Sequence, residues 1–157
     1  MKKLLSIIII LLFASNLKAQ TEFGVKGGIN ITFFNIQEGS FGPNAETELG
    51  YYGGVFIDFK IDSGFHFKPE LLYIGIDEFQ FLNAPLYLKY DIDNSFHILV
   101  GPSLNYFFDF FTNKFKVRAD LSVAYDISSK LNVHMKYTIG FEELAPNVLF
   151  LGMDFKL

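Results

Sequence analysis

Apolar and polar residues alternate along most of the chain after about residue 20, and this period of two constrains the fold more than any other feature. In the last segment, the odd positions from Leu149 to Leu157 are apolar, while Gly152, Asp154 and Lys156 occupy even positions. Such alternation is typical of a β-strand whose two faces meet different surroundings. Because the apolar face continues to the last residue, it predicts a strand at the lipid surface of a bacterial outer membrane.

The first twenty residues follow a different pattern. Two lysines precede an unbroken apolar run over residues 4–14. This run is shorter than the roughly 20 residues that a membrane-spanning helix needs, so it is typical of a secretory signal peptide; an uncleaved anchor is the alternative. The small residue Ala19 predicts cleavage after it, or one residue later. The expected domains are therefore a signal peptide at 1–19 and one β-barrel domain at 20–157.

Composition agrees with a membrane barrel. Half of the 157 residues are hydrophobic, 20 are Phe and none is Trp, and the mean hydropathy is +0.28. After the signal peptide, no apolar run is long enough for a transmembrane helix, so the hydrophobicity is spread over short alternating segments. The net charge of −4, without a basic stripe, argues against binding to nucleic acid. With no cysteine, the chain has no disulfide and no thiolate metal site.

Turn residues divide the rest of the chain into eight strand-like segments. Their expected bounds are 23–34, 47–61, 65–76, 79–92, 95–108, 115–126, 131–139 and 149–157. Charged residues avoid the apolar face, as expected if a charge on the lipid face costs roughly 2–4 kcal/mol. Strands of about twelve residues, tilted by about 40°, rise on the order of 30 Å and cover a membrane. The predicted fold class is all-β: an eight-stranded antiparallel up-and-down transmembrane β-barrel.

The connections between these segments alternate in length. The short ones, expected at the periplasmic rim together with both chain termini, are 62–64, 91–94 and 128–129. The longer ones, expected to face outward, are 35–46, 76–78, 109–114 and 142–147. The segment 35–46 is the longest and is polar, which suits contact with a partner but equally suits a connector.

Three prolines lie inside strand-like segments, at Pro69, Pro85 and Pro102. Each lacks one backbone donor in a sheet that has no free edge. We therefore expect bulges or strand starts at these positions, or segment bounds that differ by a few residues.

Several short motifs occur in order along the whole mature chain. They are Phe23-Gly24-Val25-Lys26-Gly27-Gly28-Ile29-Asn30, Tyr52-Gly53-Gly54, Pro69-Glu70-Leu71-Leu72-Tyr73, Asn83-Ala84-Pro85-Leu86-Tyr87-Leu88-Lys89-Tyr90 and Gly101-Pro102. In these motifs and their spacing the sequence resembles the PorT-like, "porin family" outer-membrane β-barrel proteins of Bacteroides-type Gram-negative bacteria. The resemblance implies an eight-stranded antiparallel barrel without catalytic residues. The family's namesake is linked to protein secretion, but the loops here are shorter than in many relatives, so that role is not carried over.

The inward face is expected to hold a network of charged side chains. Eight strands enclose a space just wide enough for side chains to fill, so a diffusion channel is not expected. Acidic and basic residues on the polar parity are nearly balanced, and buried charges persist when they are paired. The predicted lumen network, structural in role and with Glu70 and Arg118 as its central partners, comprises Lys26, Asp58, Lys60, Lys68, Glu70, Lys89, Arg118, Asp120, Lys136 and Asp154.

Catalytic and metal sites are not indicated. His66, His97 and His134 share the inward parity, but they come from separate segments and lack metal-ligand spacing. We interpret them as hydrogen-bonded lumen histidines. An outer-membrane enzyme acting on lipid or peptide would need a histidine with Asp or Ser at the outer rim, and the loops contain no histidine. No cofactor is expected.

The sequence thus predicts a monomeric outer-membrane barrel with a filled polar core and a structural or interaction role in the envelope, or an accessory part in secretion or uptake. Expected partners are outer-membrane lipid, the barrel-assembly machinery during biogenesis and an envelope protein that contacts the outward loops. The alternative is a secreted soluble barrel of the lipocalin type, whose apolar face points inward around a small hydrophobic ligand. Period two alone fits both, but the charge-free face in all eight segments favours the membrane.

Overall fold

The computed structural model describes residues 21–34, 46–76, 79–108, 114–140 and 147–157. These residues form eight strands: β1 (Thr21–Phe34), β2 (Glu46–Asp62), β3 (Phe65–Ile76), β4 (Phe79–Asp91), β5 (Phe96–Phe107), β6 (Phe115–Asp126), β7 (Leu131–Gly140) and β8 (Asn147–Lys156). Each strand pairs antiparallel with the next, and β8 pairs with β1, so the sheet closes on itself. The predicted eight-stranded antiparallel barrel is confirmed. Within the described ranges, no helix is long and apolar enough to cross a membrane.

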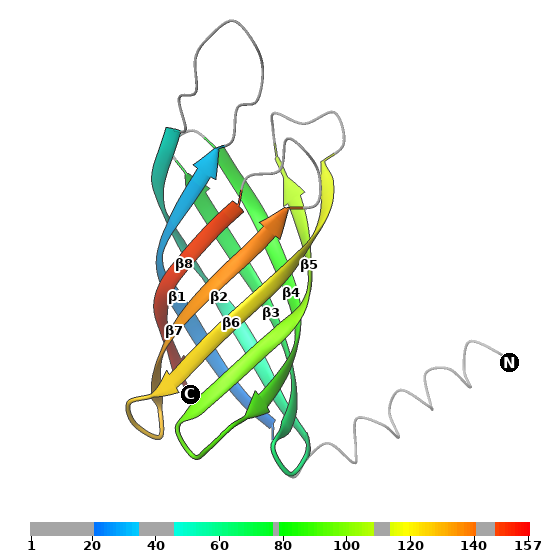
Figure 1. Ribbon diagram of the computed structural model, residues 1–157, viewed down its shortest axis with the longest axis vertical. Helices are drawn as coiled ribbons and strands as arrows, with labels where there is room; N and C mark the ends of the chain where they lie inside the picture. The colour runs from blue at the N-terminus through cyan, green and yellow to red at the C-terminus, as the bar shows by residue number, and fades with distance from the viewer. Residues whose placement is uncertain (1–20, 35–45, 77–78, 109–113, 141–146) are drawn as a thin grey trace, which may run out of the picture.

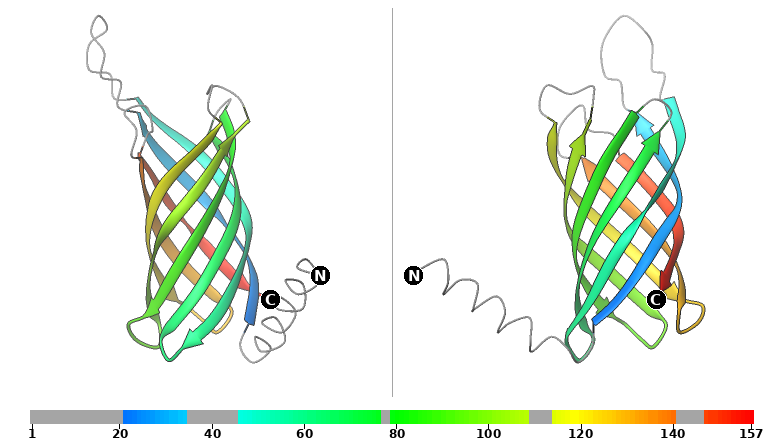
Figure 2. Two further views of the ribbon diagram at one scale, coloured as in Figure 1. Left: turned by 90° about the vertical axis from the view of Figure 1, so that its right-hand side faces the viewer. Right: turned by 180° about the vertical axis from the view of Figure 1, so that it is seen from behind.

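Three short connections lie at one end of the barrel, which we call the turn end (Figures 1 and 2). They join β2 to β3, β4 to β5 and β6 to β7, and each contains one of the predicted tight turns. The C-terminus lies at the same end (Figure 1). The predicted outward connections at 35–46, 76–78, 109–114 and 142–147 fall largely outside the described residues.

Side chains and one glycine close these turns locally. Gly64, in the β2–β3 turn, has a φ of 85°, a region that glycine enters without the steric cost that a Cβ brings. In the β4–β5 turn, the backbone N–H groups of Ser95 and Phe96 donate to Asp93 Oδ1 at 2.7 and 2.8 Å. These two bonds hold the pKa of Asp93 below its ordinary value. Short polar residues therefore fix the turns without help from the barrel interior.

The two faces of the barrel wall differ in polarity, as the alternation predicts. In β1, Val25 and Ile29 are exposed, whereas Lys26 and Asn30 are buried. Every other strand also exposes apolar side chains, among them Val55, Leu71, Leu88, Val100, Leu121, Met135 and Met153. Within the described strands, the positions that share this outward parity carry no charged residue. The wall is thus apolar outside and carries its charges inside, which gives the lipocalin-type alternative less support.

The interior is filled, and its half opposite the turn end contains a cluster of apolar side chains. This apolar layer consists of the inward side chains Tyr52, Leu72, Ile74, Ile76, Phe81, Phe107, Val148 and Phe150, none more than 8% exposed. Phe81 and Phe107 stack with their ring centroids 4.6 Å apart. Buried polar residues share this half: Asn30 and Thr32 pair with Phe150 and Val148 of the apolar layer, and Lys136 Nζ lies 4.0 Å from the centre of the Phe150 ring. The polar core expected from the sequence therefore extends past the middle of the barrel and is interleaved with the apolar layer.

The three strand prolines do not shift the register. Regular pairing is interrupted where Pro69, Pro85 and Pro102 each face one neighbouring strand, but it resumes in the same register beyond them. The expected bulges are therefore wrong, because a proline removes only one donor and its other side stays paired. In the described strands the register shifts between Lys60 and Asp62 instead, next to the β2–β3 turn.

Candidate functional site: the charged barrel interior

Four charged side chains meet in the middle of the barrel, and we call them the central quartet. They are Lys26 of β1, Lys68 and Glu70 of β3 and Asp154 of β8, all on inward positions and at most 7% exposed. Lys26 Nζ donates to both oxygens of Glu70 at 2.8 and 2.9 Å, and it lies 3.4 Å from Asp154 Oδ1. Lys68 Nζ donates to Asp154 Oδ2 at 2.6 Å and lies 3.6 Å from Glu70 Oε1. Two cations and two anions thus neutralise one another away from water.

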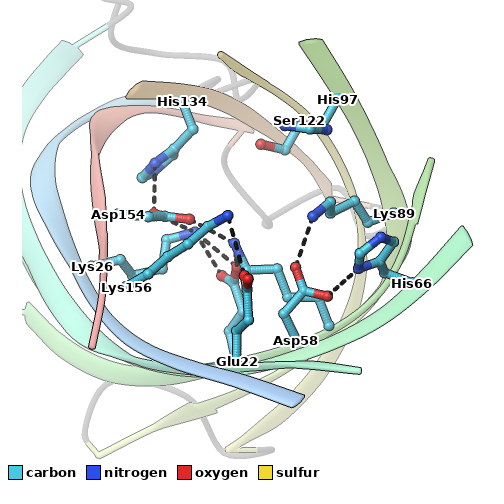
Figure 3. Close-up of polar contacts among 12 residues, drawn as sticks. Glu22, Lys26, Asp58, His66, Lys89, His97, Ser122, His134, Asp154 and Lys156 are labelled. Atoms are coloured by element: carbon cyan, nitrogen blue, oxygen red, sulfur yellow. Dashed lines mark hydrogen bonds and ion pairs between the residues drawn. The ribbon is translucent and has the colours of Figure 1, made fainter. Parts of the chain in front are cut away.

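A tyrosine and a histidine continue the polar contacts of the central quartet along the inner surface of the barrel. The Tyr52 hydroxyl of β2 is hydrogen-bonded to His134 Nε2 of β7. His134 Nδ1 in turn lies 2.9 Å from Asp154 Oδ1, as Figure 3 shows. Between Tyr52 and His134, the same row of the sheet holds Gly28 of β1 and Gly152 of β8. Because neither glycine has a side chain, the tyrosine ring can lie across two strands and reach the histidine.

We expect Gly152→Ala to destabilise the barrel by about 1–3 kcal/mol, a typical penalty for overpacking. A Cβ on Gly152 would lie 2.2 Å from the Tyr52 hydroxyl and 2.3 Å from the Gly27 carbonyl oxygen, so the tyrosine must leave His134. Urea unfolding in lipid vesicles measures the loss. The control is Gly53→Ala, where the nearest atom to the new Cβ is the Lys26 carbonyl oxygen at 3.8 Å. Equal losses in both variants would contradict this role for Gly152.

A second polar cluster surrounds Asp120 of β6. Ser103 Oγ donates to Asp120 Oδ1 at 2.9 Å, and the Tyr87 hydroxyl donates to Asp120 Oδ2 at 3.1 Å. Lys136 Nζ lies 3.4 Å from the same Oδ2 atom and donates to Asn83 Oδ1 at 2.9 Å. The carboxylate thus joins residues from β4, β5 and β7 to its own strand.

A third group of polar side chains lies toward the turn end. Asp58 of β2 accepts hydrogen bonds from Lys89 Nζ at 2.8 Å and from His66 Nδ1 at 2.6 Å (Figure 3). His66 Nε2 reaches Asp91 Oδ2 at 3.1 Å, and Asp91 Oδ1 accepts from His97 Nδ1 at 2.7 Å. Carboxylates and nitrogen donors therefore alternate around this end of the barrel.

Eight of the ten residues predicted for the lumen network lie in ion pairs with one another. These are Lys26, Asp58, Lys68, Glu70, Lys89, Asp120, Lys136 and Asp154. Lys60 is exposed beside the register shift in β2, and within the described residues it has no ion pair. The expectation that it belongs to the network is therefore wrong.

The predicted central pairing of Glu70 with Arg118 is also wrong. Glu70 accepts both of its short hydrogen bonds from Lys26. Arg118 is buried, but its guanidinium lies over the Phe107 ring at 5.4 Å, next to the apolar layer. The two residues share the inward parity but contact different side chains, and the alternation in the sequence does not report which inward residues meet.

The interpretation of His66, His97 and His134 as hydrogen-bonded lumen histidines is confirmed. The sequence did not predict their partners, which include Tyr52 and Asp91. The signal that groups them is the register between strands, which places each histidine next to a carboxylate. In the described ranges, no group of three or more His, Asp or Glu side chains is arranged to hold a metal ion.

Comparisons with known proteins give the fold. No protein-family model matches the sequence, and no curated protein matches it either. Neisserial surface protein A is similar in structure, with a TM-score of 0.60 and 11% sequence identity, over 87% of this chain and 95% of that one. Ail, the attachment invasion locus protein of Yersinia pestis, gives a TM-score of 0.58 and 9% identity over 88% and 99% of the two chains. A designed transmembrane β-barrel gives a TM-score of 0.56 and 14% sequence identity, over 87% of this chain and 93% of that one. The chain thus has the fold of small outer-membrane β-barrels.

Proposed function

We propose that this protein is a non-catalytic outer-membrane barrel with a structural or interaction role in the cell envelope. The observation that carries this proposal is the apolar outer surface, which runs over all eight strands of a closed barrel while the charges are paired inside. Such a surface is stable in lipid and would be unfavourable in water. The apolar layer and the central quartet fill the interior, which argues against a diffusion channel.

The proposed topology places the turn end in the periplasm. Support comes from the short connections and the C-terminus at that end (Figure 1), since barrels of this class have short periplasmic turns and longer outer loops. We further propose that residues 1–19 are a cleaved signal peptide and that 20–157 form the mature barrel, on the strength of the apolar run at 4–14.

The proposed partners follow from the same surface. Outer-membrane lipid covers the apolar wall, and the barrel-assembly machinery inserts a chain of this class. The motifs that resemble PorT-like proteins support membership of that family. An accessory part in secretion or uptake is one form that the proposed interaction role would take. A protein partner would contact the outward connections, of which 35–46 is the longest. We propose a monomer, because the sheet closes within one chain and leaves no unpaired edge.

The test is to isolate the outer-membrane fraction of a host that expresses the full chain and to compare gel mobility with and without boiling. A folded barrel in that fraction should run faster unboiled than boiled. A soluble periplasmic protein without a heat-shifted band would contradict the proposal and favour the lipocalin-type alternative. Reconstituted vesicles should not become permeable to small sugars, whereas permeability would contradict the filled interior.

A further inference from the structure

Three side chains toward the turn end have buried acceptor atoms that receive no hydrogen bond from any residue in the described ranges. These atoms are His97 Nε2 of β5, Asp126 Oδ1 of β6 and Asn132 Oδ1 of β7, and we call the three residues the acceptor set. His97 and Asn132 are only 6% and 5% exposed. Buried acceptors normally have a partner, so three of them without one indicate a place for a bound cation.

The acceptor set comes from three neighbouring strands and faces the interior. His97 lies on the inner side of the wall (Figure 3), and its Nε2 is 3.1 Å from Asp126 Oδ2, although the two are not aligned as a hydrogen bond. Asp126 and Asn132 are directly opposite in the β6–β7 register, which places their Cβ atoms about 4.5–5.5 Å apart. Donor atoms that share one metal ion, with bonds of about 2.1 Å, lie roughly 3–4 Å apart. The spacing of the set therefore suits a single ion.

Asp91 determines which ring nitrogen of His97 is available to a ligand. Asp91 Oδ1 accepts from His97 Nδ1 at 2.7 Å, and a neutral ring that donates from Nδ1 has its lone pair on Nε2. Metal-binding histidines commonly donate their other ring nitrogen to a carboxylate in this way. His66 differs, because its Nδ1 lies 2.6 Å from Asp58 and its Nε2 lies 3.1 Å from Asp91. Both of its nitrogens are thus already engaged.

A polar pocket of about 410 Å³ adjoins the acceptor set and is lined by both His97 and Asp126. The charged side chains that line it are four carboxylates and two ammonium groups, from Glu22, Asp91, Asp93, Asp126, Lys89 and Lys156. Lys156 Nζ lies 3.1 Å from Glu22 but 4.0 Å from Asp126, so it does not hydrogen-bond to Asp126. The excess of two carboxylates favours a divalent cation in this pocket and disfavours an anion.

We propose that the acceptor set binds a divalent transition-metal ion through His97 Nε2, a carboxylate oxygen of Asp126 and Asn132 Oδ1. One imidazole nitrogen with two oxygens suits Zn²⁺ and similar ions better than Mg²⁺ or Ca²⁺, which prefer oxygen ligands alone. Water from the pocket completes the coordination. Because one ligand is an amide oxygen, this site differs from the groups of three His, Asp or Glu side chains that the described residues lack.

Histidine side-chain ¹⁵N spectra of the untagged protein in lipid nanodiscs test the proposal without any substitution. One equivalent of ZnCl₂ should shift the Nε2 resonance of His97 and leave the resonances of His66 and His134 unchanged. His134 serves as a buried control, because its Nε2 is hydrogen-bonded to the Tyr52 hydroxyl. An unshifted His97 resonance, or a proton on His97 Nε2 in the presence of Zn²⁺, would overturn the proposal.

Calorimetric titration of the same sample with ZnCl₂ measures what each ligand contributes. His97→Gln and Asp126→Asn should each weaken Zn²⁺ binding by at least about tenfold, a loss that is typical even of residues that only orient a metal ligand. His66→Gln is the matched control, since it removes a histidine from the same pocket, and it should leave the affinity nearly unchanged. Equal losses in the two histidine variants, or Mg²⁺ binding as tight as that of Zn²⁺, would indicate a diffuse acidic surface and overturn the proposal.

Unfolding in urea gives an independent measurement. An ion that binds the folded barrel and not the unfolded chain raises the midpoint of unfolding. ZnCl₂ should therefore raise the midpoint of the wild-type protein and of His66→Gln, but not that of His97→Gln. A wild-type midpoint that does not respond to ZnCl₂ would contradict the site even if a variant does not fold.

Discussion

Glu70→Gln should lower the free energy of unfolding by about 3–5 kcal/mol, the usual consequence of removing one partner from a buried ion pair. Glu70 accepts both short hydrogen bonds from Lys26 and lies 3.6 Å from Lys68, and its side chain is fully buried. Without its charge, two buried ammonium groups share the single carboxylate of Asp154. Urea unfolding in lipid vesicles, followed by gel mobility, measures the loss.

Two variants make this prediction specific. Glu22→Gln removes the same charge from a side chain that is 53% exposed and pairs with Lys156 at 3.1 Å, so it should cost no more than about 1 kcal/mol. Replacing Lys26 and Glu70 together by Met and Leu should cost less than Glu70→Gln alone, because an apolar pair leaves no unpaired charge between them. If Glu70→Gln costs no more than Glu22→Gln, the central quartet does not stabilise the barrel.

Val100→Arg should destabilise the barrel in lipid by about 2–4 kcal/mol, the measured range for a basic residue at the midplane of a lipid face. Val100 lies in the middle of β5, is 52% exposed and pairs with Leu121 of β6 and Leu88 of β4. The arginine would have only apolar neighbours and hydrocarbon around it. The same unfolding assay measures the change.

The matched control is Ile127→Arg. Ile127 is 56% exposed and lies in the β6–β7 turn, where lipid headgroups or water can solvate the guanidinium. Its cost should fall to about 0–1 kcal/mol, because the penalty depends on depth. If the apolar surface instead faced water, both substitutions would be neutral or would improve solubility, and the membrane assignment would be wrong.

The sequence predicted the faces of the strands well because a period of two is a local property. Leu71 points outward and Glu70 inward whatever the rest of the barrel does. The bounds of the strands could be predicted for the same reason, because turn-forming residues such as Gly64 and Asp93 mark where strands end. The alternation also predicted that charged side chains point into the barrel, without showing which of them pair with one another.

The partners inside the barrel could not be predicted in this way. Glu70 shares its inward parity with every lysine of the interior, and only the register of all eight strands decides that Lys26 reaches it and Arg118 does not. The apolar layer was missed for a related reason. Ile74, Phe81 and Phe150 come from three strands, and their common height depends on how the sheet closes.

Several of the interior contacts cross the seam where β1 meets β8, the first and last strands of the chain. Lys26 to Asp154, Lys68 to Asp154 and Tyr52 to His134 all join residues on opposite sides of this seam. They cannot form before the two ends of the sheet have met, so they are absent from any transition state in which the barrel is still open. Contacts of this kind slow unfolding and hardly change the folding rate. If the barrel closes only after the transition state, removing a seam contact should therefore speed unfolding and leave the folding rate almost unchanged.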